Sequence, residues 1–301
     1  MKIYILAIFL ILSSHLFSAT YEDIDDLWYG KKRFTPAKSL AMSGAENVGA
    51  NRSEAAFLNP ATLITKEKKY IIGFDAQYSS DSIPTQMMVS AVDSRTSILA
   101  GGAYASYYTY SKKVNGKTVN YSNLQVGLSY AYPIMGGLVL GIGGRYLKYT
   151  KNDDNYIHTV TFDLGATYSF SPYVKIGVVG YNLTNIDNIE APMRMAGGIS
   201  VGDEKLFLFN FDVVADFSAP EIYHSSDSAL YEYHACFEFM PTEGFSILGG
   251  YEINKILDKN YWSAGFQLFV PESRVELVTG YQQAVKGKKD KYFNFSLRLY
   301  F

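Results

Sequence analysis

Cysteine and charge are both scarce in this chain. A single thiol, Cys236, cannot form an internal disulfide framework or a cysteine-based zinc site. Charged residues make up 19% of the sequence, below the roughly 25% of soluble domains. The formal net charge of -2 gives no sign of a nucleic-acid partner. The composition therefore excludes a disulfide scaffold and a cysteine-based zinc protein, and it predicts no binding to nucleic acid.

Long hydrophobic runs are equally rare. The clearest one, residues 4–12, follows Lys2 and leads into small residues at Ser18 and Ala19. About nine apolar residues are too few to cross a bilayer, which takes about 20. They suit the core of a secretory signal peptide over residues 1–19, cleaved near its end. No other run is long enough for a transmembrane helix, so the exported chain is expected in the periplasm, outside the cell, or in the outer membrane as a barrel.

Tyrosine, phenylalanine and glycine are abundant, with 26, 19 and 25 residues. From residue 69 onward the sequence falls into segments of about ten residues in which apolar and polar positions alternate. In the segment 158–170, Phe162 and Leu164 fall on one face of the expected strand, and Thr161 and Asp163 on the other. This alternation predicts a succession of β-strands.

Short turns and longer polar loops separate these segments in alternation. About fourteen segments fit the sequence, an allowed even number for an outer-membrane barrel. Short turns are expected near Ser94, Pro133, Ser171, Gly202, Pro241 and Pro271. Longer loops are expected near Ser80 and over residues 112–117, 151–155, 184–192, 218–228, 255–260 and 285–290. The segments near Met87 and Leu99 alternate poorly.

A soluble all-β domain, such as a secreted sandwich, would show the same alternation. Fourteen strands are too many for a sandwich of usual size, and the polar face is rich in Gly, Thr and Ser. We therefore expect an all-β fold, a transmembrane antiparallel β-barrel over residues 69–301 in the outer membrane of a diderm bacterium. Its last strand, ending at Phe301, should close against a first strand near residues 70–78.

Residues 20–68 do not alternate. Small residues there permit tight packing in a confined space, and the residue before Pro60 should be extended. We expect this segment to fold into the barrel as a plug. The residues that stand out, in the stretches LAMSGA and AAFLNPATL, are Ala41, Met42, Gly44, Asn59, Pro60 and Ala61.

These stretches, placed just before a barrel, resemble the FadL-like and PorV-like outer-membrane β-barrel superfamily, in which an Asn-Pro-Ala element belongs to an N-terminal hatch. The resemblance implies a hatch over residues 20–68 and passive transport of small hydrophobic molecules. Its PorV-like side implies an alternative, a non-transporting scaffold for secretion or surface attachment of partner proteins.

Isolated charges mark the polar face of the expected strands. Inside a barrel they would pair with one another or hold the plug, because unpaired charges in a confined lumen are costly. They could also form a polar path that selects a solute. The residues expected to face the lumen are Asp75, Arg145, Asp163, Arg194, Asp212, Asp216, Glu232, Glu238, Glu252, Glu276 and Arg298.

No catalytic site is expected. His234 shares a strand face with Glu232, Cys236 and Glu238, but residues two apart on a strand are about 6.5 to 7 Å apart, which is long for a nucleophile–base hydrogen bond. No phosphate loop, nucleophile elbow or metal-spaced His/Cys set appears. We predict no enzyme, no cofactor and no metal. The expected partners are outer-membrane lipid, the barrel-assembly machinery, and either a small hydrophobic ligand or a secreted or periplasmic protein.

Overall fold

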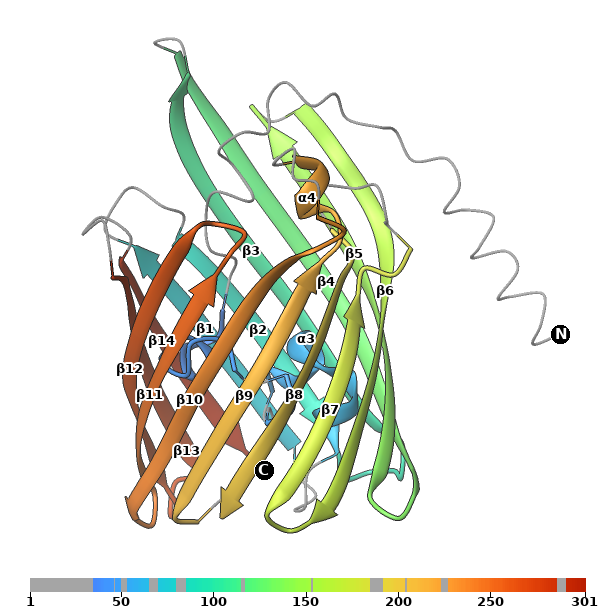
Figure 1. Cartoon of the computed structure of the whole chain (residues 1–301), viewed down its shortest axis with the longest axis vertical. Coiled ribbons are helices and arrows are strands. Elements are labelled where there is room, and N and C mark those ends of the chain that lie inside the picture. Colours follow the sequence, from blue (N-terminus) through green and yellow to red (C-terminus); the bar gives the residue numbers. More distant parts are fainter. Residues whose placement is uncertain are drawn as a thin grey trace, which may run out of the picture.

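The structure is a computed structural model. It describes residues 35–45, 47–49, 53–64, 70–79, 85–114, 117–152, 154–184, 192–203, 205–222, 227–285 and 291–301. The predicted signal peptide, residues 1–19, lies outside the described residues. Over the part of the chain that is described, fourteen antiparallel strands form a closed barrel (Figure 1), which confirms the predicted fold class.

Each strand pairs with its neighbours in sequence, so the barrel is a simple up-and-down meander. The strands are β1 (Tyr70–Ser79), β2 (Thr85–Asp93), β3 (Ala100–Val114), β4 (Lys117–Met135), β5 (Leu138–Lys151), β6 (Asp154–Ser171), β7 (Val174–Tyr181), β8 (Arg194–Asp203), β9 (Phe207–Asp216), β10 (Leu230–Thr242), β11 (Phe245–Asn254), β12 (Lys259–Val270), β13 (Val275–Ala284) and β14 (Lys291–Tyr300).

The barrel closes between its first and last strands. β1 pairs antiparallel with β14 from Ile71, opposite Tyr300, to Ser79, opposite Tyr292. This confirms the predicted closure of the last strand, which ends near Phe301, against a first strand near residues 70–78. A closed barrel has no exposed sheet edge, which is why strands can cross a bilayer in this form.

Burial is inverted relative to a soluble domain. On β14, Phe293 and Phe295 are 48% and 37% exposed, whereas Asn294 and Ser296 are 1% and 0% exposed. The other strands also place most of their large apolar side chains outside and most polar ones inside, although β2 has apolar residues on both faces. An apolar outer face around a polar interior is typical of a β-barrel in a lipid bilayer, and it argues against a soluble β-sandwich.

Strand length differs around the barrel. β3 to β6 have 15, 19, 14 and 18 residues, whereas crossing a bilayer takes about 9–11. Their hairpins rise above the other strands at the upper end of Figure 1. The predicted loops over residues 112–117 and 151–155 were therefore wrong for most of their length, because β3 and β4 extend into the first and β5 and β6 into the second.

The short turns lie close to the predicted positions, but glycine rather than proline makes two of them. Pro133 and Pro241 are still within β4 and β10. The chain reverses at Gly137 and Gly244, which have φ of 92° and 82°. Only glycine adopts such angles readily. The two chain reversals therefore lie at the glycines and not at the nearby prolines.

In the described residues ahead of β1, three short helices are present: α2 (Ala37–Ala41), α3 (Ala55–Leu58) and the 3₁₀ helix η2 (Pro60–Leu63). A fourth, α4 (Ala219–Ile222), follows β9. Among the described residues, no helix has the length and apolar character needed to cross a membrane. We call the described residues between 35 and 64 the luminal segment, because they lie inside the barrel (Figure 1).

Candidate functional site

The helix α2 packs on an inner wall made of glycine. It lies against β12, β13 and β14, where Gly265 and Gly280 are paired across β12 and β13. A Cβ atom added to Gly265 would lie 2.5 Å from Cβ of Ala41, and one added to Gly250 on β11 would lie 2.8 Å from the backbone of Met42. These wall positions therefore have no room for any side chain while α2 is in place.

A positive backbone angle ends the α2 turn. Gly44 has φ of 85°, and its N–H donates to the carbonyl of Ser39 at 2.7 Å. The imidazole of His234 packs against Gly44: a Cβ added to Gly44 would lie 3.1 Å from Nδ1 of His234. The same Nδ1 is 2.5 Å from the carbonyl oxygen of Ser43. A carbonyl can only accept, so Nδ1 carries the proton of this hydrogen bond.

The Asn59-Pro60-Ala61 element forms a compact cap. Asn59 is extended, with φ −150° and ψ 110°, as expected for a residue before proline. Its Oδ1 accepts from the N–H of Ala61 at 3.0 Å, and its Nδ2 donates to the carbonyl of Asn47 at 2.7 Å. One buried amide thus starts η2 and ties it to an earlier part of the luminal segment.

A second glycine pair receives this element. Gly141 on β5 and Gly165 on β6 are opposite one another. A Cβ on Gly141 would come within 3.0 Å of Pro60 and Ala61, and one on Gly165 would come equally close to Asn59. The barrel wall is therefore shaped to fit the Asn-Pro-Ala element at a position far from α2.

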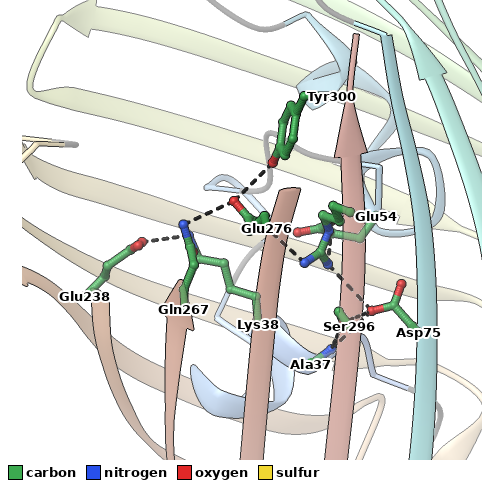
Figure 2. A network of polar contacts seen from close by, with 10 residues as sticks. Ala37, Lys38, Glu54, Asp75, Glu238, Gln267, Glu276, Ser296 and Tyr300 are labelled. Atoms are coloured by element: carbon green, nitrogen blue, oxygen red, sulfur yellow. Dashed lines mark hydrogen bonds and ion pairs between the residues drawn. The ribbon is translucent and has the colours of Figure 1, made fainter. Parts of the chain in front are cut away.

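A buried ion network joins the luminal segment to the barrel seam. Arg298 on β14 is fully buried and lies 3.0 Å from Glu54 of the segment, 3.5 Å from Asp75 on β1 and 3.4 Å from Glu276 on β13. Figure 2 shows the three carboxylates around this point of the wall. Asp75 also accepts hydrogen bonds from Ser296 and from the N–H of Ala37. The network joins the closing strands to two parts of the luminal segment, at Ala37 and at Glu54.

A second ion pair lies beside it. Nζ of Lys38, on α2, is 2.6 Å from Oε2 of Glu238 on β10, and both side chains are 5% exposed (Figure 2). Glu276 also accepts from Gln267 at 3.2 Å and from the hydroxyl of Tyr300 at 3.1 Å. Removing one partner of a buried pair is costly because the other charge stays buried, so these contacts hold the segment firmly in position.

The other predicted lumen residues form separate groups. Arg145 pairs with Asp163, which also accepts from the N–H of Asn182 at 2.9 Å. Arg194 lies 2.5 Å from Asp216 and 3.6 Å from Glu232. These pairs lie on the inner faces of β5, β6 and β8 to β10.

Two more carboxylates bind amides. Asp212 accepts from the N–H of Asn47 at 2.8 Å, and Glu252 accepts from Asn254 and Gln282 at 3.0 and 3.1 Å. The polar faces of the strands thus gather Asp75, Glu276 and Arg298 in one cluster and distribute the remaining charges around the wall.

Two residues of the Cys–His–Glu group considered above, Cys236 and His234, bind the luminal segment. The thiol of Cys236 donates to the carbonyl of Ala45 at 3.7 Å, and the imidazole of His234 is bonded to Ser43. His234 also lies 3.6 Å from Glu232. Among the described residues, no group of three or more His, Cys, Asp and Glu is arranged to hold a metal ion.

The opposite side of the luminal segment is apolar. Ala56 and Leu63 pack with Ile71, Met88 and other buried residues of β1 to β4. Met88 and Val92 point inward on β2, so both faces of this strand carry apolar residues. This contact explains the poor alternation near Met87 in the sequence.

Sequence reasoning did not identify several contact residues of the luminal segment. Lys38 and Glu54 lie in a region without periodicity, so no pattern indicates which way they point. The receiving glycines were visible only as part of a glycine-rich polar face. Their signal is that they fall opposite one another on neighbouring strands, which requires the strand register. They are Gly141, Gly165, Gly250, Gly265 and Gly280.

Solved structures with the same fold include a hydrocarbon channel, a toluene transporter and a FadL homologue. The CymD monoaromatic hydrocarbon channel superposes with a TM-score of 0.68 at 13% identity, over 88% of this chain and 96% of that one. The toluene transporter TodX of Pseudomonas putida gives 0.62 at 12% identity, over 91% and 99%. A Pseudomonas aeruginosa FadL homologue gives 0.61 at 8% identity, over 88% and 97%. These likenesses define the class of the fold, a β-barrel of the FadL type.

A family model narrows this class. It matches residues 31–218 and is described as "Putative MetA-pathway of phenol degradation". The match spans more than half of the chain, and the protein belongs to this family. A comparison with curated proteins finds no match. The fold implied by the FadL-like part of the predicted resemblance is therefore confirmed, whereas its PorV-like part stays a prediction.

Proposed function

We propose that this protein is a passive outer-membrane channel for small hydrophobic molecules, and that the luminal segment is its hatch. The observation that carries the proposal is the set of contacts between the luminal segment and the barrel wall. It fills glycine-lined positions of the wall and is fixed by a few buried ion pairs, so it is a separate body within a closed barrel. The structurally similar proteins CymD and TodX, described as a hydrocarbon channel and a toluene transporter, support this function.

The mechanism requires no covalent chemistry. A solute would enter from the outer end, where β3 to β6 rise above the membrane, and move down its own concentration gradient. The hatch would have to shift for the solute to pass, which breaks the contacts of Glu54 and Lys38. The wall strands would keep their pairing, because the hatch contributes no strand to the barrel. Export by a cleaved signal peptide, residues 1–19, and assembly by the barrel-assembly machinery belong to the same proposal.

Uptake of labelled toluene by intact cells tests the channel. The outer membrane of the host is the barrier, and a polar sugar serves as the solute that should not respond. We expect the wild-type barrel to increase toluene uptake, and deletion of residues 35–64 to increase it further. No increase with either protein, at equal amounts of folded barrel, would disprove the channel.

The role of the buried ion pairs in holding the hatch is tested separately. Glu54→Gln removes a charge from the hatch and leaves the wall unchanged, so we expect higher uptake than in the wild type. Glu243→Gln, in the exposed turn after β10, is the matched control and should behave as the wild type. If the deletion raises uptake and Glu54→Gln does not, the channel stands and the ionic seating of the hatch is wrong.

A scaffold for partner proteins is the second candidate, favoured by the projecting β3 to β6 hairpins. β4 alone has 19 residues, about twice the 9–11 of a membrane-crossing strand, so it offers a surface outside the bilayer. Stable co-purification of a secreted protein, lost when residues 110–121 and 150–157 are shortened, would support this PorV-like function. Absence of a partner together with toluene uptake would support the channel.

A further inference from the structure

The inner wall formed by β3, β4 and β5 carries an unusual group of polar atoms. Asn123 on β4 is 1% exposed, and neither its Oδ1 nor its Nδ2 has a hydrogen-bond partner. The next inward residue on the strand, Gln125, has an unpartnered Oε1. The buried hydroxyl of Tyr104 and Nε of Arg145 are also unpartnered. Such atoms are rare in native proteins, since each costs about 1–3 kcal/mol when it is left without a partner.

Strand register brings these atoms together. Tyr108, Asn123 and Tyr149 form one row across the three strands, because Asn123 is opposite both tyrosines. Tyr104 and Arg145 form another row on either side of Gly127. Gln125 lies on β4 between the two rows. Neighbouring strands are about 4.8 Å apart and residues two apart on a strand about 6.6 Å apart, so the unpartnered atoms of Asn123 and Gln125 lie within reach of one small molecule. The row of Tyr104 and Arg145 lies about 13 Å along β4 from Asn123.

The surroundings of this patch are aromatic. The buried rings of Tyr108 and Tyr149 flank Asn123. At the lower row, Phe57 of the luminal segment meets Tyr104 edge to face, with ring centroids 5.2 Å apart. The guanidinium of Arg145 lies 5.9 Å from the centre of the Phe57 ring. The patch therefore reaches from the upper lumen to the luminal segment and offers flat apolar surfaces next to free donors and acceptors.

Charge narrows the ligand class. Arg145 is the charged residue of the patch, and it is paired with Asp163. The patch therefore has no net charge to attract an anion or a cation. Unpartnered donors and acceptors still require a hydrogen-bonding group, and the rings favour a flat apolar body.

We infer that this patch is a binding subsite for small neutral molecules with an aromatic body and a hydroxyl or carbonyl group, and that Asn123 is its specificity-determining residue. The inference deepens the proposed channel function. A site built to hydrogen-bond a substituent discriminates against the analogue that lacks it, because the polar atoms of the site then stay unpaired. The subsite should thus favour polar-substituted aromatics over plain hydrocarbons of the same size.

Equilibrium binding to the purified full-length barrel in detergent tests the subsite. The probes are p-cresol and p-xylene, which differ by a hydroxyl in place of a methyl group. Asn123→Leu keeps the size of the side chain and removes its polar atoms. We expect its Kd for p-cresol to rise about tenfold, while its Kd for p-xylene stays within about twofold. Comparing each variant with the wild type in the same detergent removes the effect of partitioning into micelles.

Two further variants complete the test. Asn210→Leu is the matched control, because Asn210 is also buried with both amide atoms unpartnered but lies on β9. It should change neither Kd. Gln125→Leu removes the unpartnered Oε1 two residues from Asn123, and we expect about a threefold rise in the Kd of p-cresol. If Asn123→Leu fails to form a heat-modifiable barrel, Gln125→Leu decides the outcome.

The inference is overturned if the wild type does not bind p-cresol, which would mean that the patch holds only water. It is also overturned if Asn123→Leu weakens both probes equally, or if Asn210→Leu has the same effect as Asn123→Leu. Selective binding without toluene uptake in cells would leave the subsite standing and remove the channel. Toluene uptake without selective binding of p-cresol would support the channel and overturn the subsite.

Discussion

The luminal segment contacts two walls of the barrel in different ways. At the seam side, formed by β10 to β14 and β1, buried ion pairs add to the glycine contacts of α2: Arg298 reaches Glu54, and Glu238 reaches Lys38. At the side of β5 and β6, the Asn-Pro-Ala element fits against Gly141 and Gly165. Ion pairs can be broken by neutralising one group, whereas a packed glycine contact changes only when the backbones separate. A single change of charge should therefore weaken the contacts of the seam side and leave those at β5 and β6 unchanged.

The seam network should give the largest effect on stability. Arg298→Ala leaves three buried carboxylates without their cation, so we expect the free energy of unfolding to fall by about 3–5 kcal/mol. Urea unfolding of the barrel in lipid vesicles measures this. Arg274→Ala, in the exposed turn before β13, is the control and should change the value by less than about 0.5 kcal/mol. Equal losses for the two variants would show that Arg298 holds nothing in place.

The glycine contact on β5 should give an intermediate effect on the free energy of unfolding. Gly141→Ala adds a methyl group where Pro60 and Ala61 lie closer than 3.0 Å, and overpacking of this kind costs about 1–3 kcal/mol. Gly144→Ala, on the same strand, meets only the ring of Phe162 at 3.5 Å and should be nearly neutral. The same urea titration compares them. A neutral Gly141→Ala would mean that the segment is not pressed against β5.

The cap of the Asn-Pro-Ala element should give the smallest effect of the three. Asn59→Ala removes the acceptor of the Ala61 N–H and the donor to Asn47, and loss of such a cap costs about 0.5–2 kcal/mol. Limited proteolysis of the segment should accelerate accordingly. Asn260→Ala, on the outer part of β12, is the control. Unchanged protection in Asn59→Ala would show that the Asn59 side chain is dispensable for the local structure.

The comparison of the two walls also shows where sequence reasoning succeeds. β14 has one lipid face and one lumen face, and its alternation predicted both correctly. β2 lacks that alternation, since Met88 and Val92 point inward against the apolar side of the luminal segment. The irregular part of the pattern thus marked a contact with the segment, but a single sequence gives no means of telling such a contact from a loop.

The candidate site was only partly predictable. The inward direction of Asp75, Glu276 and Arg298 follows from their positions on alternating strands. Their meeting at one point does not, because it depends on the register between β13, β14 and β1 and on the placement of Glu54. Likewise Asn123 could be placed on the polar face of a strand, but its lack of partners and its position between Tyr108 and Tyr149 required the assembled barrel.

The sequence by itself determined a fourteen-strand barrel that closes near Phe301, because strand periodicity is a local property that each segment carries independently. Only the tertiary structure decided how the luminal segment is seated, which glycines receive it and which charges hold it. Some of those contacts join residues 200 positions apart, such as Lys38 and Glu238. They depend on strand register and barrel closure, and neither of these is written in the period of any one segment.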